Sequence, residues 1–560
     1  MLAFPGILYA ENKTVVVEAT YIMGDGESPV QAEAKAFDAA KEKAITQLLP
    51  FVMAHTKSRQ PPFSPQQLRT ITEATSEVEL LEKKRMLAGE RLQVTAKVRG
   101  TLDGTKVLSE IKRREKRMQA EKLTKEADDI ERQILSKRIK QLDNKTALPR
   151  ENFSSDYKKA FQLYSQAIDT DPTFSAPYVG RHSIYKHQYS QLGNAMADLS
   201  RAIELEPDEK KRSDYHAVRA HTYKDLGEQK LAVADFTEAI NRDPNVDYLW
   251  ERGKLFEELG QKEQAIEDFS RILNMELSKD KEWYRKFTLD ARASAYVDLR
   301  QYDNALVDYT HLIRLTNGAE GYGSRAMLYM KLHELEKAVS DFTQEIAQRR
   351  NRNPSELHSE SESLKRALFL RALSYNMLAQ HENVVSDVTE YLLHDPKNDR
   401  QRATAYDLRG RAYGSLKQED KALADYTEAL RVDPQRASAY YRRGMIYTFM
   451  RVWDRGISDL TEALRLHHMD SVGSDVKLKD NELGGAYLLR GGAHLNLNHV
   501  DQSLSDLNEA LRRSPKDTQA LFWRGLTHAQ LKDTASARTD LHQACQLGHD
   551  AACEALQTLP

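Results

Sequence analysis

One arginine and one aspartate recur together along this 560-residue chain, 16 residues apart in each case. Opposite charges at a fixed spacing can form structural salt bridges, or the arginines can present a row of cations to an acidic ligand. An aspartate accompanies every arginine, so the field largely cancels and we expect structural pairs. These pairs are Arg219 and Asp235, Arg252 and Asp268, Arg292 and Asp308, Arg325 and Asp341, Arg371 and Asp387, Arg409 and Asp425, Arg443 and Asp459, Arg490 and Asp506, and Arg524 and Asp540.

Other motifs offer little chemistry. Neighbouring His467 and His468 would point about 100° apart on a helix, and no HExxH frame surrounds them. The segments Gly24–Gly26 and Gly321–Gly323 are too short for a dinucleotide or phosphate-binding loop. No nucleophile, acid and base come together in the sequence. We therefore predict no enzyme, with no catalytic residue, no metal site, no cofactor and no small-molecule substrate.

The composition excludes several classes of protein. Lysine and arginine number 82 against 84 acidic residues, a net charge of −2, which supplies no broad positive field for nucleic acid. Two cysteines are too few for a disulfide-stapled scaffold or an all-cysteine zinc site. No stretch approaches 18 apolar residues, so we expect no transmembrane segment.

The arginine–aspartate spacing also predicts the elements that carry it. Sixteen residues is too far for one helix face but suits facing points on two antiparallel helices joined by a short turn. Successive arginines from Arg219 to Arg524 are 33, 40, 33, 46, 38, 34, 47 and 34 residues apart. An earlier unit slips by one, because Asp198 follows His182 by 16 and Arg181 stands beside it. The chain therefore repeats a helix pair about every 34 residues, with insertions.

This pattern resembles the tetratricopeptide repeat family, whose unit is a helix–turn–helix of 34 residues. The resemblance implies a mainly α fold: an α-solenoid of about ten repeats over residues 150–548, with a capping helix at 549–560. Each unit has a small residue after the arginine, an aromatic in the seam between the helices, alanines in the second helix and often a terminal proline. Examples are Gly410, Gly444, Tyr413, Tyr447, Ala422, Pro434 and Pro515.

Cys545 and Cys553 resemble the cysteine pair of secreted variants of these repeats, in which the pair bridges adjacent helices. That resemblance implies a disulfide that would hold the capping helix in place. The alternative is two buried thiols in a reducing cytosol.

The first 145 residues have a different character. Residues 1–10 are apolar and read as a possible remnant of a signal peptide, or as an ordinary first segment. Residues 11–105 predict a small α+β domain, with strands at 14–21 and 92–98 around alanine-rich helix. This module is similar to N-terminal modules of bacterial envelope proteins. Residues 106–145 predict a long amphipathic linking helix, with a nucleic-acid or lipid-binding arm as the less favoured interpretation.

The resemblance also indicates which residues would line the concave groove. In the last three repeats the residues at these positions around the repeated arginine are apolar and aromatic, which is the composition expected of a ligand groove. The alternative interpretation is that these residues pack against the capping helix. Co-chaperones of this family that bind acidic tails carry asparagines next to the arginine, and none occurs at those positions here. The groove residues are Tyr441, Met445, Phe449, Leu488, Leu495, Phe522 and Leu526.

These observations lead to two functional hypotheses. The first is a non-enzymatic scaffold of the bacterial cell envelope or periplasm, which binds protein or peptide partners in its groove. The alternative is a cytoplasmic adaptor that self-associates through the 106–145 helix. The sequence leaves the partner and the oligomeric state open.

Overall fold

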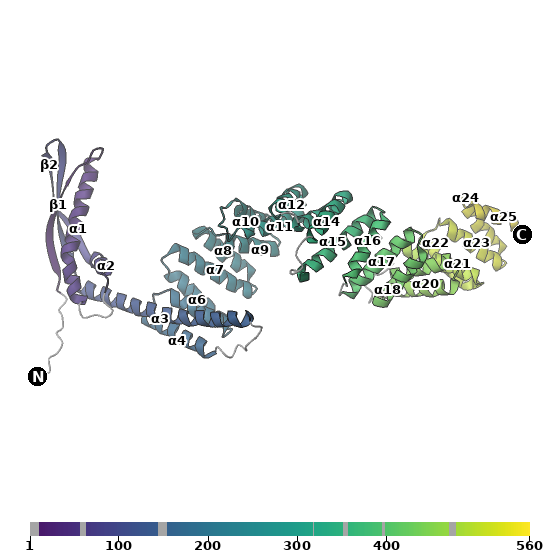
Figure 1. Cartoon of the computed structure of the whole chain (residues 1–560), viewed down its shortest axis with the longest axis horizontal. Helices are drawn as coiled ribbons and strands as arrows, with labels where there is room; N and C mark the ends of the chain where they lie inside the picture. The colour runs from purple at the N-terminus through teal and green to yellow at the C-terminus, as the bar shows by residue number, and fades with distance from the viewer. Residues whose placement is uncertain are drawn as a thin grey trace. The chain divides into compact units, whose positions relative to one another are not determined.

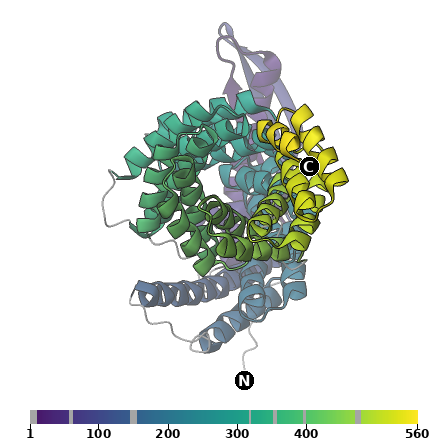
Figure 2. The same ribbon diagram turned by 90° about the vertical axis from the view of Figure 1, so that its right-hand side faces the viewer.

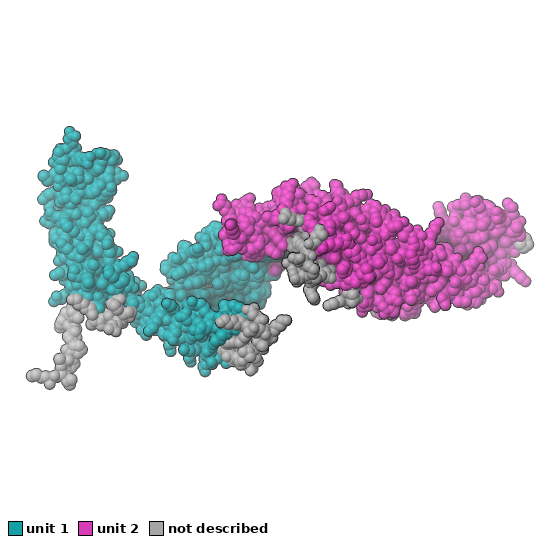
Figure 3. Space-filling view, in the orientation of Figure 1, with its two compact units in different colours: residues 1–255 teal, residues 256–560 magenta. Residues whose placement is uncertain are grey.

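The computed structural model describes residues 11–56, 63–143, 154–316, 319–350, 357–394, 398–469 and 478–559. The chain divides into two compact units, residues 1–255 and 256–560 (Figure 3). The predicted order of a small α+β module followed by a helical solenoid is confirmed (Figure 1).

The N-terminal module is a three-stranded antiparallel sheet in the order β1-β3-β2, with helix α1 on one face. Its elements are β1 Lys13–Ile22, α1 Pro29–Thr56, α2 Pro65–Thr75, β2 Ser76–Ala88 and β3 Arg91–Leu102. Alanines of α1 pack on the central strand, where small side chains let helix and sheet approach closely. Strand β2 was not among the predicted elements, because nearly half of its residues are charged and nearly all are exposed.

Helix α3 runs from Gly104–Asp143, close to the predicted linking helix. Its second half packs against α4, Ser154–Thr170, through a cluster that includes Ala127 and Tyr164. The helix therefore joins the sheet to the array and also forms the first antiparallel helix hairpin with α4.

Nine helix pairs lie within the two units between α5 and α24 in the part of the chain that the structure describes. In unit 1 they are α5 Ala176–His187 with α6 Leu192–Leu205 and α7 Glu209–Asp225 with α8 Gln229–Arg242. Helix α9, Val246–Glu258, contains the boundary between the units. Unit 2 continues with α10 Lys262–Asn274, α11 Trp283–Asp298, α12 Tyr302–Thr316, α13 Ala319–Lys331, α14 Leu335–Arg350, α15 Leu357–Met377, α16 His381–Leu393, α17 Asp399–Ser415, α18 Glu419–Val432, α19 Ala437–Phe449, α20 Trp453–His467, α21 Asp480–Asn496, α22 Val500–Arg513, α23 Thr518–Gln530, α24 Thr534–Gln546 and α25 Asp550–Thr558.

Two backbone features make each pair compact. Glycine lies where the helices cross: a Cβ added at Gly410 would lie 2.9 Å from Tyr426, and one at Gly444 would lie 3.0 Å from Leu460. The turn between the helices contains one residue with positive φ, for example Arg451 at 60°. Most of these turns have a non-glycine residue in this left-handed conformation, at a cost of about 1 kcal/mol each. Within unit 2 the pairs follow a curved path (Figure 2).

Candidate functional site

The repeated arginine and aspartate form a bidentate ion pair between the two helices of a repeat. In eight of the nine predicted pairs, Arg Nε and Nη2 donate to the two carboxylate oxygens at 2.6 to 2.9 Å. The slipped unit uses Arg181, which binds Asp198 at 2.8 and 2.7 Å. Arg252 and Asp268 fall in different units, and their pairing stays a prediction.

Each arginine also binds the preceding helix–turn–helix repeat. Its Nη1 donates to a side-chain oxygen two residues after the aspartate of that repeat, as in Arg325 to Thr310 at 3.0 Å and Arg443 to Thr427 at 3.2 Å. This acceptor was not predicted, although a serine, threonine or asparagine occupies the position in every case: Ser200, Thr237, Ser270, Thr310, Thr343, Thr389, Thr427, Thr461 and Asn508. One guanidinium therefore joins three helices.

Burial and pKa agree with a structural role for these pairs. The aspartate side chains are 3 to 9% exposed. Burial acts to raise the pKa of Asp235, but hydrogen bonds from Arg219 and His216 outweigh it and hold that pKa below its usual range. Because the arginines already bind carboxylates and hydroxyls of the array, the geometry favours structural pairs over a row of free cations.

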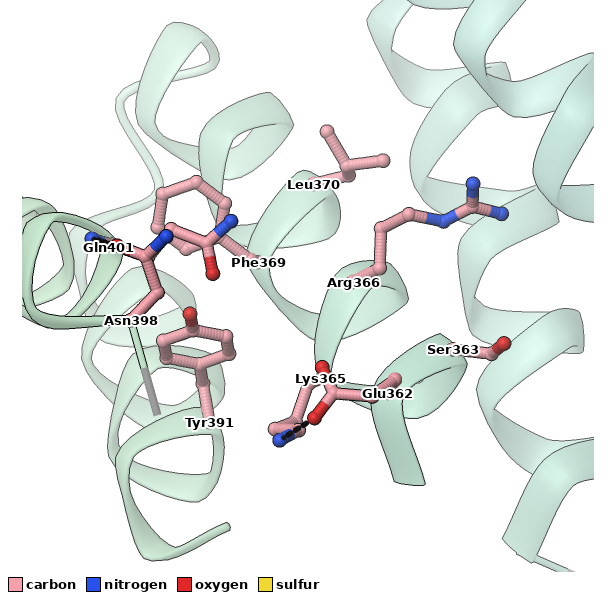
Figure 4. Close-up of a pocket in the computed structure, with 9 residues that line it drawn as sticks. All are labelled: Glu362, Ser363, Lys365, Arg366, Phe369, Leu370, Tyr391, Asn398 and Gln401. Atoms are coloured by element: carbon pink, nitrogen blue, oxygen red, sulfur yellow. Dashed lines mark hydrogen bonds and ion pairs between the residues drawn. The ribbon is translucent and has the colours of Figure 1, made fainter. Parts of the chain in front are cut away.

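Two cavities in unit 2 share a wall on α15. The first, about 580 Å³, lies among α11 to α15 and is lined by Phe287, Asp290 and Met327, among others. The second, about 510 Å³, lies among α15, α16 and the start of α17 (Figure 4). Ser363 and Arg366 on α15 line both cavities. An extended segment could therefore contact both cavities in succession.

The second cavity combines aromatic and polar groups. Phe369 and Tyr391 pack with ring centroids 5.3 Å apart. Asn398 and Gln401 approach from the first turn of α17, where the Asn398 side chain caps the helix by accepting from the Gln401 backbone N–H at 3.2 Å. Such a mixture, an apolar wall with a few polar groups, is typical of binding sites.

The repeat pattern contains a signal for these cavities that the sequence analysis did not use. Four residues after the repeated aspartate most units have alanine, as at Ala429 and Ala463. In the middle of the array this position is instead Leu312, Glu345 and Tyr391. Leu312 and Tyr391 line the cavities, and Glu345 binds the cavity residue Arg349 at 2.9 Å. Two of the long spacings between arginines, 46 and 38 residues, lie in the same region, whereas the longest, 47 residues, lies between Arg443 and Arg490 in the later repeats.

The seven predicted groove residues lie in different environments. Phe449 is 69% exposed, whereas Leu495 is buried at 8%. Tyr441 packs against α21, because a Cβ at Gly485 would lie 2.7 Å from its hydroxyl. Phe522 stacks on His549 with centroids 4.6 Å apart, beside the capping helix α25. Met445 and Leu526 are half-buried, and so is Leu488, which packs with Phe522 in the C-terminal core. None of the seven lines either cavity of unit 2.

Other polar groups of the sequence analysis have local partners. His468 lies 3.2 Å from the Tyr487 hydroxyl, and His467 ends α20. Cys545 and Cys553 form a disulfide that joins the end of α24 to α25. Among the described residues, no group of three or more histidines, cysteines or carboxylates could hold a metal ion.

A polar cluster fastens α3 to α4 where no arginine–aspartate pair exists. The buried Tyr164 hydroxyl lies 2.7 Å from Asp128 Oδ1 and 3.2 Å from Glu131 Oε2. Burial raises the pKa of Glu131 to about 7. The described helices include none that is long and apolar enough to cross a membrane.

Comparisons with known proteins agree with the helix pairs. Two family models, each described as a tetratricopeptide repeat, match residues 218–280 and 488–552 and residues 403–436. Serine/threonine-protein phosphatase 5 of Rattus norvegicus is 35% identical over 92 residues, which is 16% of this chain and 18% of the phosphatase. The Homo sapiens phosphatase is 34% identical over the same length. The chain thus spans less than a fifth of these relatives.

Three of the solved structures that match this chain have low sequence identity to it. A tetratricopeptide repeat protein from Parabacteroides merdae is 18% identical, covers 46% of this chain and 93% of its own, and has a TM-score of 0.31. The Cut9–Hcn1 hetero-tetramer of the APC/C is 13% identical. The match covers 74% of this chain and 97% of the other, with a TM-score of 0.32. YrrB, described as a TPR protein with an unusual peptide-binding site, is 19% identical. The match covers 44% of this chain and 97% of YrrB, with a TM-score of 0.26. Models of the tetratricopeptide repeat thus match three stretches of this chain, and helix pairs also lie between those stretches in the part that the structure describes.

Proposed function

We propose that this protein is a non-enzymatic scaffold whose binding surface is the pair of cavities on either side of α15. Tetratricopeptide repeat arrays are protein-interaction scaffolds, and their partners are proteins or peptides. One observation carries the proposal: two cavities of about 510 and 580 Å³ share residues Ser363 and Arg366, so one extended segment could occupy both. The proposed site precedes the groove residues expected from the sequence, which lie on α19, α21 and α23.

The apolar part of the surface favours a polypeptide. Phe287 on α11 is 45% exposed, and Met327 on α13 is 39% exposed in the same cavity. Lys286 lies 5.1 Å from the Phe287 ring. An aromatic, a methionine and a charged rim suit an amphipathic partner.

Site-specific photocrosslinking tests this function. A photoreactive amino acid at Met327 should capture a partner in the native cell, and Phe287→Ala should reduce that capture. The same amino acid at Val307, exposed on α12 and lining neither cavity, is the matched control. Equal capture from both positions, or capture unaffected by Phe287→Ala, would refute this binding surface. Crosslinking from Phe449 would test the groove at the C-terminal repeats.

We further propose that the protein works in the bacterial cell envelope. The disulfide between Cys545 and Cys553 supports an oxidising compartment, because such bonds are rare in the cytosol. The resemblance of the N-terminal module to envelope modules points the same way. Quantifying free thiols in protein trapped directly from cells tests this localisation. Two reactive thiols per chain would instead favour a cytoplasmic protein.

The second candidate is a cytoplasmic adaptor that self-associates through α3. One observation favours it: Leu135 and Ile139 lie one turn apart on α3 and are 59% and 52% exposed. Sedimentation should then show an oligomer that Leu135→Glu dissociates, and a monomeric wild-type protein would exclude the candidate.

A further inference from the structure

The cavity between α15, α16 and α17 contains a tyrosine hydroxyl that faces the cavity. The Tyr391 residue as a whole is only 5% exposed, and its hydroxyl makes no hydrogen bond to any of the residues that the structure describes. In Figure 4 this hydroxyl is turned toward Asn398 and Gln401 on α17. The oxygen itself is not enclosed, so a molecule in the cavity can accept a hydrogen bond from it.

The position of Tyr391 in the repeat shows that helix packing does not require its hydroxyl. It lies four residues after Asp387, where Ala429 and Ala463 fill the same place in later repeats. Alanine would satisfy the repeat and bring no polar atom. Departures from a repeat are expected at functional sites. The hydroxyl is therefore available to a ligand.

The charge around the cavity is positive. Lys365 is 5% exposed, and its ammonium pairs with Glu362, whose own side chain is 69% exposed. Arg366 is exposed on the next position of α15 and forms no ion pair with any described residue. Two cations and one carboxylate leave a net charge of +1 at this wall. Glu362 itself reaches into solvent.

The Tyr391 hydroxyl is a donor at neutral pH. Burial raises the pKa of Tyr391 and the negative charge of Glu362 raises it further, so the proton stays on the oxygen. A ligand that accepts a hydrogen bond and carries one negative charge would meet both the unpaired donor and the net positive charge. A phosphoryl group, which carries about −1.5 to −2 charges at neutral pH, would exceed that charge.

We propose that this cavity is a specificity pocket for one aspartate or glutamate side chain of the bound partner segment, held by the Tyr391 hydroxyl and by the positive charge of Lys365 and Arg366. The proposal deepens the proposed function and rests on it. It differs from the two-asparagine arrangement of the co-chaperones, because the donor here comes from the second helix of a unit and the ligand group is a side chain. Phe369 would pack on the methylenes of that side chain.

A peptide library with one varied position tests the pocket. The probes are fluorescent nonapeptides with acetylated and amidated ends, Leu- and Ser-rich, in which the central residue is Glu, Gln, Asp, Asn or phosphoserine. Binding to the full-length chain is measured by anisotropy. We expect Glu and Asp to bind about tenfold more tightly than Gln and Asn, and phosphoserine to show no further gain. An added preference for phosphoserine would overturn the assignment to a carboxylate.

Two variants make the test specific. Tyr391→Phe keeps the ring contact with Phe369 and removes only the hydroxyl, so the preference for Glu over Gln should fall to about a third or less of its wild-type value. Arg366→Gln, at an exposed position, should lower it as well. Tyr413→Phe is the matched control for loss of a tyrosine hydroxyl in the adjoining unit, outside the cavity.

The outcomes separate the two proposals. If Glu and Gln peptides bind equally tightly and Phe287→Ala still weakens both, the specificity pocket is wrong and the proposed binding surface stands. If no probe binds and no partner is captured from Met327, the binding surface itself is wrong. A charge preference that survives both Tyr391→Phe and Arg366→Gln would place the acidic group elsewhere.

Discussion

The middle repeats, α11 to α16, and the later repeats, α17 to α24, use the same ion pair but different residues around it. Arg371 and Asp387 in the middle and Arg409 and Asp425 just after it bind with nearly equal distances. Four residues after the aspartate, however, the later units have alanine and the middle ones have leucine, glutamate and tyrosine. The pair is thus common to both regions, whereas the position four residues after the aspartate differs, and two of its larger residues, Leu312 and Tyr391, line the cavities.

The largest effect should come from removing the shared pair. Asp341→Ala in the middle and Asp425→Ala later each leave a partly buried guanidinium without its carboxylate, at a cost of about 3–5 kcal/mol in local unfolding free energy. Hydrogen exchange resolved by helix is the measurement, because repeat arrays open locally. Glu428→Ala, which removes an exposed pair with Arg431, should cost less than about 1 kcal/mol. A much smaller loss in the middle repeats would show that the two regions stack differently.

The disulfide should stabilise only the end of the later repeats. Reduction, or Cys553→Ala, releases α25 from α24 and should lower the local stability of α25 by about 2–3 kcal/mol in the chain-entropy account. The rate of amide hydrogen exchange in α25 should rise, while the rate in α15 should stay the same. Faster exchange in α15 after reduction would mean that the cap supports the whole array.

Exchanging the position after the aspartate tests the comparison directly. Ala463 is fully buried, so Ala463→Tyr overpacks a later unit and should cost about 1–3 kcal/mol. Tyr391→Phe in the middle should change stability by less than about 0.5 kcal/mol, since the lost hydroxyl has no partner among the described residues. Denaturant titration of both variants is the measurement. A later unit that accepts tyrosine without loss would contradict the difference in packing between the regions.

The smallest effect should be a pH dependence outside both regions. The pKa of Glu131 is raised to about 7, so the folded chain holds a proton that the unfolded chain releases near its ordinary value. The contribution of protonated Glu131 to the free energy of unfolding is complete below about pH 4.5 and is lost as the pH rises through about 7. The α3–α4 hairpin should therefore be about 1 kcal/mol less stable near pH 8 than near pH 5.5, because partial exposure reduces the full effect. Glu131→Gln should flatten this profile, measured by exchange in α4, and an unchanged profile would assign it to another group.

The array was predictable from sequence because its main contact recurs at one spacing. Strand β2 was not, since an exposed charged strand lacks the apolar alternation that marks a buried one. Helix α3 was expected to link the domains, yet its pairing with α4 depends on Tyr164, which belongs to no repeat pattern.

The cavities were harder to predict than the fold. Counting residues from the repeated arginine identifies the positions that face the concave side of each repeat. It does not show which of those positions are covered by side chains of neighbouring helices. Phe522 is covered by His549, which follows the end of α24, and Tyr441 packs against Gly485 on α21. Tyr391 was visible only as an exception to the alanine pattern.

The bond from each arginine to the preceding unit has a consequence for how this protein can change over evolutionary time. Arg325 reaches Thr310 across 15 residues of chain, and Arg371 reaches Thr343 across 28, at the same 3.0 Å. Because side chains rather than loops hold neighbouring repeats in register, the connecting segments can gain residues at an entropic cost that grows only slowly with length. New surface can therefore be added between repeats without disturbing the helices that carry it.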